Sequence, residues 1–168
     1  MVIYVSKKNI FMIIFLFLLS FLWHFMYDWF PCVLTSIFFP VNESIWEHMK
    51  IIFYCLFIGG VLEKKGNNYY LNILVKPLVG VLFYLIIFIP LYLIFGESMF
   101  ISLSLMLFTY IIMELLGIKI SKQEELNIKA LPIIIIILIS ILFSILTFYP
   151  LHNFLFFDSV KLGYGILK

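Results

Sequence analysis

The sequence contains no arginine, and only 12% of its 168 residues are charged. Because about a quarter of the residues in an average soluble domain are charged, we expect no soluble fold. All eleven cationic side chains are lysines, and the formal net charge is +2. They form no basic stripe of the kind that follows a phosphate backbone, so nucleic acid is not an expected partner.

Cysteine is also scarce. Cys32 and Cys55 have neither the spacing of a metal site nor a Cys-x-x-Cys arrangement, and we interpret both as small apolar fillers. A small-x-small cleavage site is missing after the apolar run that follows Lys7 and Lys8. We therefore expect this run to be retained as a first membrane helix.

Apolar residues, in contrast, make up 65% of the chain. At about 20 residues per crossing, the length accommodates five spanning helices and leaves no room for a separate soluble domain. We predict an all-α integral membrane bundle that forms one transmembrane domain over residues 1–168. The helices are expected near residues 10–27, 44–62, 71–95, 99–118 and 129–148.

Two regions outside these helices are expected to be irregular. Pro31 and Pro40 lie in the stretch between the first two helices and predict an irregular loop. The tail from Pro150 onward is interrupted by Gly163 and Gly165 and is too short to span, so we expect it to lie in the membrane interface.

The lysines predict an orientation, because short cytoplasmic loops contain an excess of positive charge. With the N-terminus inside, seven lysines are cytoplasmic and three are outside, which favours an N-in, C-out topology. The seven are Lys7, Lys8, Lys64, Lys65, Lys119, Lys122 and Lys129, and the three are Lys50, Lys161 and Lys168. Lys76 is expected to snorkel to the inner interface.

The choice of residues also hints at the source. Ile, Phe, Lys and Asn are abundant while Arg is absent, which is typical of coding sequences rich in A and T. This indicates a low-GC bacterium, and hence a multi-pass protein of a bacterial cytoplasmic membrane.

Five crossings place all three histidines, His24, His48 and His152, at the outer ends of the first, second and fifth helices. Four carboxylates lie beside them in the sequence: Asp28, Glu43, Glu47 and Asp158. Ionisable groups at membrane depth are costly and usually functional. We predict that the three imidazoles come within reach of a common centre.

The first of these histidines has a carboxylate four residues away. His24 and Asp28 therefore share a helix face. In a structural interpretation, Asp28 accepts the imidazole N–H; in a functional one, it orients His24 as a metal ligand. Both interpretations place the two side chains in contact.

The densest polar block is Asn42 to Lys50. Ser44 and Glu47 match a capping box, which would begin a helix without any further purpose. A capping box explains neither Glu43 nor His48. Glu43 and Glu47 repel each other if both are ionised, so a cation, a proton or a metal should compensate.

Glu114 is a buried carboxylate at the inner side of the fourth helix. We interpret it as structural: neutral, paired with Lys119, or close to water.

The block Asn42-Glu-Ser-x-Trp-Glu-His48, together with His24 to Asp28 and the tail from Pro150 to Gly165, resembles a family of bacterial multi-pass membrane proteins known only as a domain of unknown function. The resemblance covers the whole chain and implies a shared site without supplying a chemistry.

A weaker similarity is to the membrane hydrolases that include alkaline ceramidases, in which three histidines, an aspartate and a serine form a zinc site among seven helices. The three histidines, Asp28 and Ser44 match that composition. The paired His-x-x-x-His and two helices are missing.

These residues support three hypotheses. The first is a metal-dependent membrane hydrolase that acts on a lipid-like or amphipathic substrate at the outer face. In it, His24, His48 and His152 hold Zn²⁺ with Asp28 beside them, Glu47 or Glu43 is the general base, and Ser44 lies in the same catalytic block. The second is a binding or transport-accessory protein that uses the same groups for protons or a cationic ligand. The third is a purely structural polar cluster.

Overall fold

The computed structural model describes residues 5–63, 66–126 and 128–166. In these residues, five helices are long and apolar enough to cross a membrane. They are α1 (Lys7–Trp29), α3 (Ile45–Leu62), α4 (Tyr69–Phe95), α5 (Met99–Ile120) and α6 (Ala130–Phe148). The prediction of an all-α multi-pass membrane bundle is confirmed. Helices are the expected solution because lipid offers the backbone no hydrogen-bond partners.

The short elements lie outside the spans. A sixth helix, α2 (Val33–Phe38), occupies the stretch between α1 and α3, so the predicted irregular loop is wrong there. Pro31 and Pro40 lie on either side of α2 and leave its hydrogen bonds intact. The tail forms a hairpin of β1 (Phe157–Asp158) and β2 (Gly163–Tyr164), which pair antiparallel.

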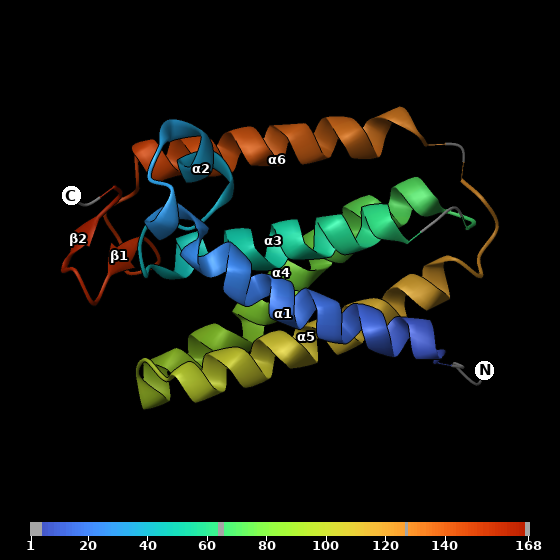
Figure 1. Ribbon diagram of the computed structural model, residues 1–168, viewed down its shortest axis with the longest axis horizontal. Coiled ribbons are helices and arrows are strands. Elements are labelled where there is room, and N and C mark those ends of the chain that lie inside the picture. Colours follow the sequence, from blue (N-terminus) through green and yellow to red (C-terminus); the bar gives the residue numbers. More distant parts are fainter. Residues whose placement is uncertain (1–4, 64–65, 127, 167–168) are drawn as a thin grey trace.

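α3 is the central helix of the bundle (Figure 1). It packs against α4 and α1; α5 packs against α4 and α1; and α6 packs against α4 and α2. The two termini lie at opposite ends (Figure 1). We call the end with α2, the start of α3 and the β-hairpin the histidine end, and the other the N-terminal end. Spanning helices that follow one another in the chain run in opposite directions, so α4 and α6, which pack together, are parallel.

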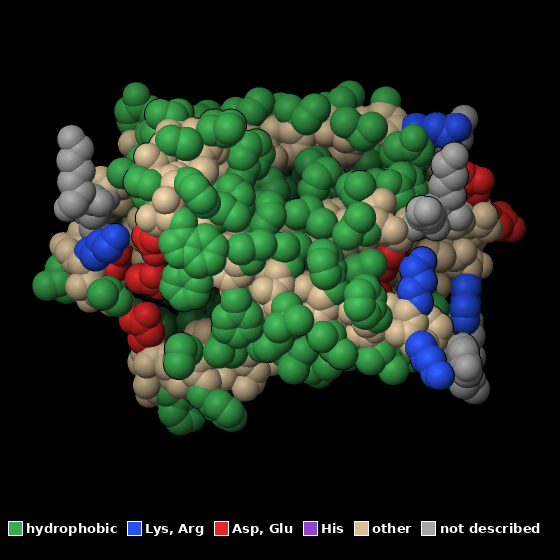
Figure 2. All heavy atoms as spheres, viewed as in Figure 1, with side chains coloured by type: hydrophobic (Ala, Val, Ile, Leu, Met, Phe, Trp, Pro, Cys, Tyr) green, Lys and Arg blue, Asp and Glu red, His purple; other side chains and the backbone are tan. Residues whose placement is uncertain are grey.

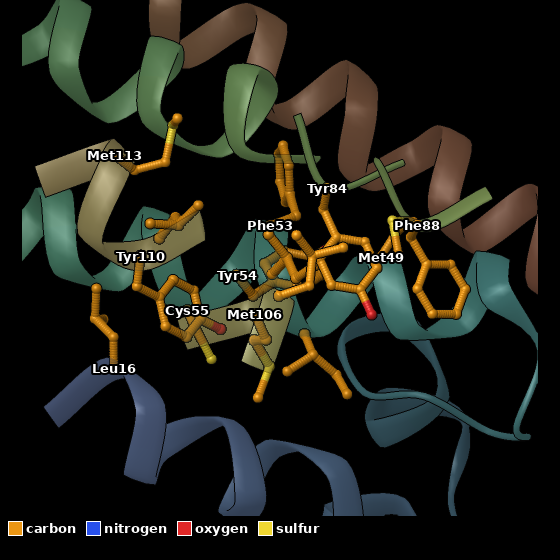
Figure 3. Close-up of a cluster of buried hydrophobic side chains, with 14 of the residues drawn as sticks. Leu16, Met49, Phe53, Tyr54, Cys55, Tyr84, Phe88, Met106, Tyr110 and Met113 are labelled. Atoms are coloured by element: carbon orange, nitrogen blue, oxygen red, sulfur yellow. The ribbon is translucent and has the colours of Figure 1, made fainter. Parts of the chain in front are cut away.

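The core is built around α3 (Figure 3). Leu16 of α1, Phe53 of α3 and Tyr110 of α5 are each at most 1% exposed. The Tyr110 hydroxyl lies 2.6 Å from the Ser20 hydroxyl, so this buried polar atom is satisfied. Cys55 is fully buried beside them, as expected of an apolar filler.

Cys32 is different. Its thiol is exposed at the start of α2, so the interpretation of Cys32 as a small apolar filler is wrong. The residue lies in a turn rather than on an apolar helix face. Hydrogen bonds with Thr35 lower the pKa of this thiol below its usual value.

Figure 2 shows lysines gathered at the N-terminal end, with apolar side chains covering the middle of the visible face. Lys64, Lys65 and Lys168, which entered the orientation argument, lie outside the described residues. Lys76 does not snorkel, contrary to prediction: its side chain is 0% exposed and pairs with two carboxylates. Ion pairing within the bundle replaces the escape to water.

Candidate functional site

The site begins at the turn that starts α3. The Ser44 hydroxyl accepts the backbone N–H of Glu47 at 3.3 Å and caps the helix. The Ser44 N–H donates to the Asn42 side chain at 2.9 Å, so only one half of the predicted capping box forms. This turn leaves Glu43 just outside the helix and His48 one turn inside it.

The C-terminal tail holds this turn in place. Asp158 is fully buried, and its carboxylate accepts the N–H of Glu43 at 3.1 Å. The Asn42 side chain donates to the Gly165 carbonyl at 2.8 Å, and the Trp46 backbone N–H donates to the Leu155 carbonyl at 2.8 Å. Residues more than 100 positions away in sequence therefore fix the backbone that presents Glu43.

Glu43 lies between two imidazoles. Its Oε2 is 3.4 Å from Nε2 of His48, and its Oε1 is 3.8 Å from Nε2 of His24. The two rings lie side by side, with centroids 5.2 Å apart. We call His24, Glu43 and His48 the histidine cluster. Its three side chains are half-buried, each about one-third exposed or less.

The hydrogen bond of His48 fixes which of its two ring nitrogens carries the hydrogen. The Nδ1 of His48 lies 2.9 Å from the Ser44 carbonyl, which can only accept, so Nδ1 is protonated. In neutral His48 the lone pair of Nε2 then faces the Glu43 carboxylate, another acceptor. A proton or a metal ion between these two acceptors would make the contact favourable. His24 Nδ1 is also buried without a hydrogen-bond partner among the described residues.

A cavity of about 340 Å³ adjoins the cluster. Its walls come from α1, α3, α4 and α5, and they are mostly apolar. They include Phe21 and Phe25 of α1 and Met99 of α5, which are themselves exposed on the surface of the bundle. An apolar cavity of this size with a few convergent polar groups is the usual form of a small-molecule site.

Glu47 does not belong to this site. Its carboxylate pairs with Lys50 at 2.7 Å, accepts the Thr147 hydroxyl at 2.7 Å and accepts the Val41 N–H at 3.1 Å. The residue is 2% exposed. Of the two predicted bases, only Glu43 faces the cavity. Ser44 is buried and engaged as the helix cap.

The third histidine is not in the cluster. His152 is exposed, and its ring stacks on Tyr164 of the hairpin with centroids 4.6 Å apart. The prediction that all three histidines share a common centre is therefore wrong for His152. The tail turns toward the start of α3 through its backbone and Asp158, and this turn directs His152 elsewhere.

The predicted hydrogen bond between His24 and Asp28 is also not formed, because Nδ1 of His24 has no partner among the described residues. A spacing of four residues puts two side chains on one helix face but does not orient them toward each other. The part of the chain that the structure describes holds one group able to bind a metal, and its members are His24, Glu43 and His48.

Glu97 was not among the residues predicted from the sequence. This residue lies in the turn between α4 and α5 and lines the same cavity as the histidine cluster. Its carboxylate accepts a hydrogen bond from the Ser159 hydroxyl. The signal was available, since an odd number of crossings places this turn on the same membrane face as His24 and His48.

At the N-terminal end, the expected partner of Glu114 is also corrected. Glu114 pairs with Lys76 rather than Lys119, and Lys76 pairs in addition with Glu63 at 2.9 Å. Lys76 lies on the neighbouring helix, α4, and is buried at the same depth as Glu114 of α5.

Comparison with known proteins gives one positive result. No curated protein and no solved structure matches the chain. A family model described as a family of unknown function, DUF6512, matches residues 2–166. With nearly the whole chain matched, this protein belongs to the DUF6512 family.

Proposed function

We propose that this protein is a zinc-dependent membrane hydrolase whose site is the histidine cluster and whose substrate is amphipathic. The observation that supports it most directly is the lone pair of His48 Nε2 facing the Glu43 carboxylate at 3.4 Å. Two ligand atoms bound to zinc at ~2.0–2.2 Å in a tetrahedral site lie roughly 3.3–3.5 Å apart. The pair is thus spaced as two zinc ligands.

The ligand set also fits zinc. Two imidazoles and a carboxylate are the three protein ligands of a known class of catalytic zinc sites, which leave a fourth position open. The contact from His48 Nδ1 to the Ser44 carbonyl is the kind of hydrogen bond that orients a metal-binding histidine. Zinc bound here would activate a water molecule near neutral pH.

The residues around the cluster divide the remaining tasks. Glu97 lines the cavity and is the carboxylate left to accept a proton once Glu43 is a ligand. The apolar walls bind the acyl or alkyl part of a substrate, and their exposed Phe21, Phe25 and Met99 offer entry from the lipid. We place the histidine end outside a bacterial cytoplasmic membrane, with the N-terminus inside, because lysines gather at the N-terminal end.

The test is the zinc content of the purified protein. We expect about one zinc per chain after dialysis, and its loss in a variant with both His24→Ala and His48→Ala. His152→Ala is the matched control and should retain zinc. Wild-type protein without stoichiometric zinc, or equal zinc in all variants, would overturn the proposal. Zinc-bound protein should then hydrolyse a fluorogenic ester with an alkyl tail.

A second candidate function is supported by the same contact, because a proton on His48 satisfies Glu43 as well as a metal does. The protein would then bind a cationic or protonated ligand without breaking bonds. Ligand binding by zinc-free protein that depends on pH and occurs without turnover would favour this function. Stoichiometric zinc would exclude it.

A further inference from the structure

A second cavity, of about 260 Å³, lies at the N-terminal end. It is enclosed by the start of α1, the end of α3, the start of α4 and the end of α5. It shares no lining residue with the cavity at the histidine end. A ligand bound in this second cavity therefore contacts none of the residues of the histidine cluster.

The inner wall of this cavity is acidic. Glu63 lines it, and behind Glu63 the Lys76 ammonium is held between the Glu63 and Glu114 carboxylates. Lys76 is 0% exposed and Glu114 is 2% exposed. One ammonium is therefore shared between two carboxylates, and Glu63 is the one of the two that lines the cavity.

The same wall also has acceptors without donors. Asn72 is 4% exposed and lines the cavity; its amide N–H₂ donates to Ser121, while its Oδ1 has no partner among the described residues. Behind this wall, Glu114 Oε2 is also buried and unpartnered within that part of the chain, but Glu114 does not line the cavity. Buried acceptors are normally satisfied, and leaving one unsatisfied is costly. The wall therefore offers hydrogen-bond acceptors to a ligand that carries N–H donors.

The outer rim has the opposite charge. Lys8 and Lys122 line the cavity and are both exposed. Lysine ammonium groups are suited to phosphate as point charges. From the inner wall to the rim, the cavity thus presents an acidic wall rich in acceptors and then two cations.

We propose that this cavity binds a phosphoethanolamine group, with its primary ammonium at Glu63 and Asn72 and its phosphate at Lys8 and Lys122. A choline group has the same charge but no N–H, so it cannot satisfy the Asn72 oxygen. Either a phospholipid headgroup or a free phosphoethanolamine provides this chemistry. The volume and the position at the end of the bundle suit both sources.

The test compares ethanolamine with choline in two arms. Native mass spectrometry of the protein in nanodiscs compares phosphatidylethanolamine with phosphatidylcholine, and calorimetry in detergent compares phosphoethanolamine with phosphocholine. We expect the ethanolamine form to bind roughly tenfold more tightly, since choline leaves a buried acceptor unpaired. Preference in the lipid arm alone assigns the headgroup, and preference in the solution arm assigns the free compound.

Variants test whether the residues of this cavity cause the preference for ethanolamine over choline. Asn72→Leu and Glu63→Gln should bind the two forms equally, while Glu125→Gln, an exposed carboxylate at the same end that does not line the cavity, should behave as wild type. Equal binding of ethanolamine and choline by wild-type protein in both arms would overturn the proposal, and this comparison needs no variant to fold. An unchanged preference in both Asn72→Leu and Glu63→Gln would overturn it as well.

Discussion

Glu43 and Glu47 are four residues apart, yet the structure gives them opposite environments. Glu47 is buried, and Lys50, Thr147 and the Val41 N–H satisfy its carboxylate. Glu43 is half-exposed beside a cavity, and its side chain faces only the two imidazoles among the described residues. One carboxylate has a full set of partners, and the other faces groups that match it only if a cation is added.

Within one short block, one carboxylate contributes to stability and the other is available for chemistry. A buried carboxylate with an ammonium and two further donors on its oxygens is out of reach of a substrate. A carboxylate that faces imidazoles at the edge of a cavity can bind an ion or exchange a proton. We therefore assign Glu47 to the fold and Glu43 to the site.

The largest effect is expected from breaking the buried pair. Lys50→Met leaves Glu47 charged without a counter-ion and also removes the hydrogen bond from Lys50 to the Ser36 carbonyl of α2. We expect a loss of about 3–5 kcal/mol in the free energy of unfolding. Thermal unfolding in detergent, followed by circular dichroism, measures it.

The control for this prediction removes both charges. Glu47→Leu combined with Lys50→Met should recover much of the lost stability, because a well-packed apolar pair often replaces a buried ion pair at little cost. Equal stability of wild type and the single Lys50→Met variant would contradict the assignment of Glu47 to the fold.

The second prediction concerns Glu43. Glu43→Gln removes the anionic ligand while keeping the size of the side chain, so we expect roughly a hundredfold weaker zinc binding. The midpoint of thermal unfolding of the zinc-free protein should stay unchanged. Competition with a fluorescent zinc chelator measures the affinity. A large fall in zinc-free stability would instead place Glu43 with Glu47.

A smaller effect is expected from Asp158, which accepts the N–H groups of Glu43, Val160 and Lys161. Asp158→Asn replaces one of these acceptor oxygens with a donor and loosens the turn that presents Glu43. We expect about tenfold weaker zinc binding, in the range seen for groups that orient metal ligands. Ser159→Ala, in the neighbouring position, should leave zinc affinity unchanged.

The prediction that perturbs the protein least tests its membrane orientation by labelling the native cysteines. Cys32 is exposed at the histidine end with a lowered pKa, so more of it is thiolate at neutral pH and it should react readily with a maleimide. Cys55 is buried and should not react. A membrane-impermeant maleimide should label intact cells through Cys32, and Cys32→Ser should abolish the signal.

A second cysteine completes the orientation test. In the Cys32→Ser background, Asn67→Cys at the N-terminal end should react only after the cells are opened, and Ser159→Cys should react before. Labelling of both positions from the same side would contradict either the five crossings or the orientation.

The sequence by itself determined the membrane bundle, because long apolar runs in lipid can satisfy their backbone only as helices. It also determined that α1, α3 and α6 bring His24, Glu43 and His48 to one end together with the tail, since an odd number of crossings fixes which helix ends meet. Only the tertiary structure decided which side chains touch there. Helix spacing did not predict that Nδ1 of His24 would miss Asp28, or that His152 would stack on Tyr164.

The partners of the buried charges were decided in the same way. Lys76 was expected to reach water, and Glu114 to pair within its own helix, if at all. Lys76 of α4 and Glu114 of α5 instead pair with each other, because helix packing places these two buried groups at the same depth. An ion pair there is stronger than one at the surface. Local spacing describes only neighbours along one helix. The contacts that give Glu43 and Glu47 different environments come from elements about a hundred residues away in sequence. Only the packed bundle brings these elements together.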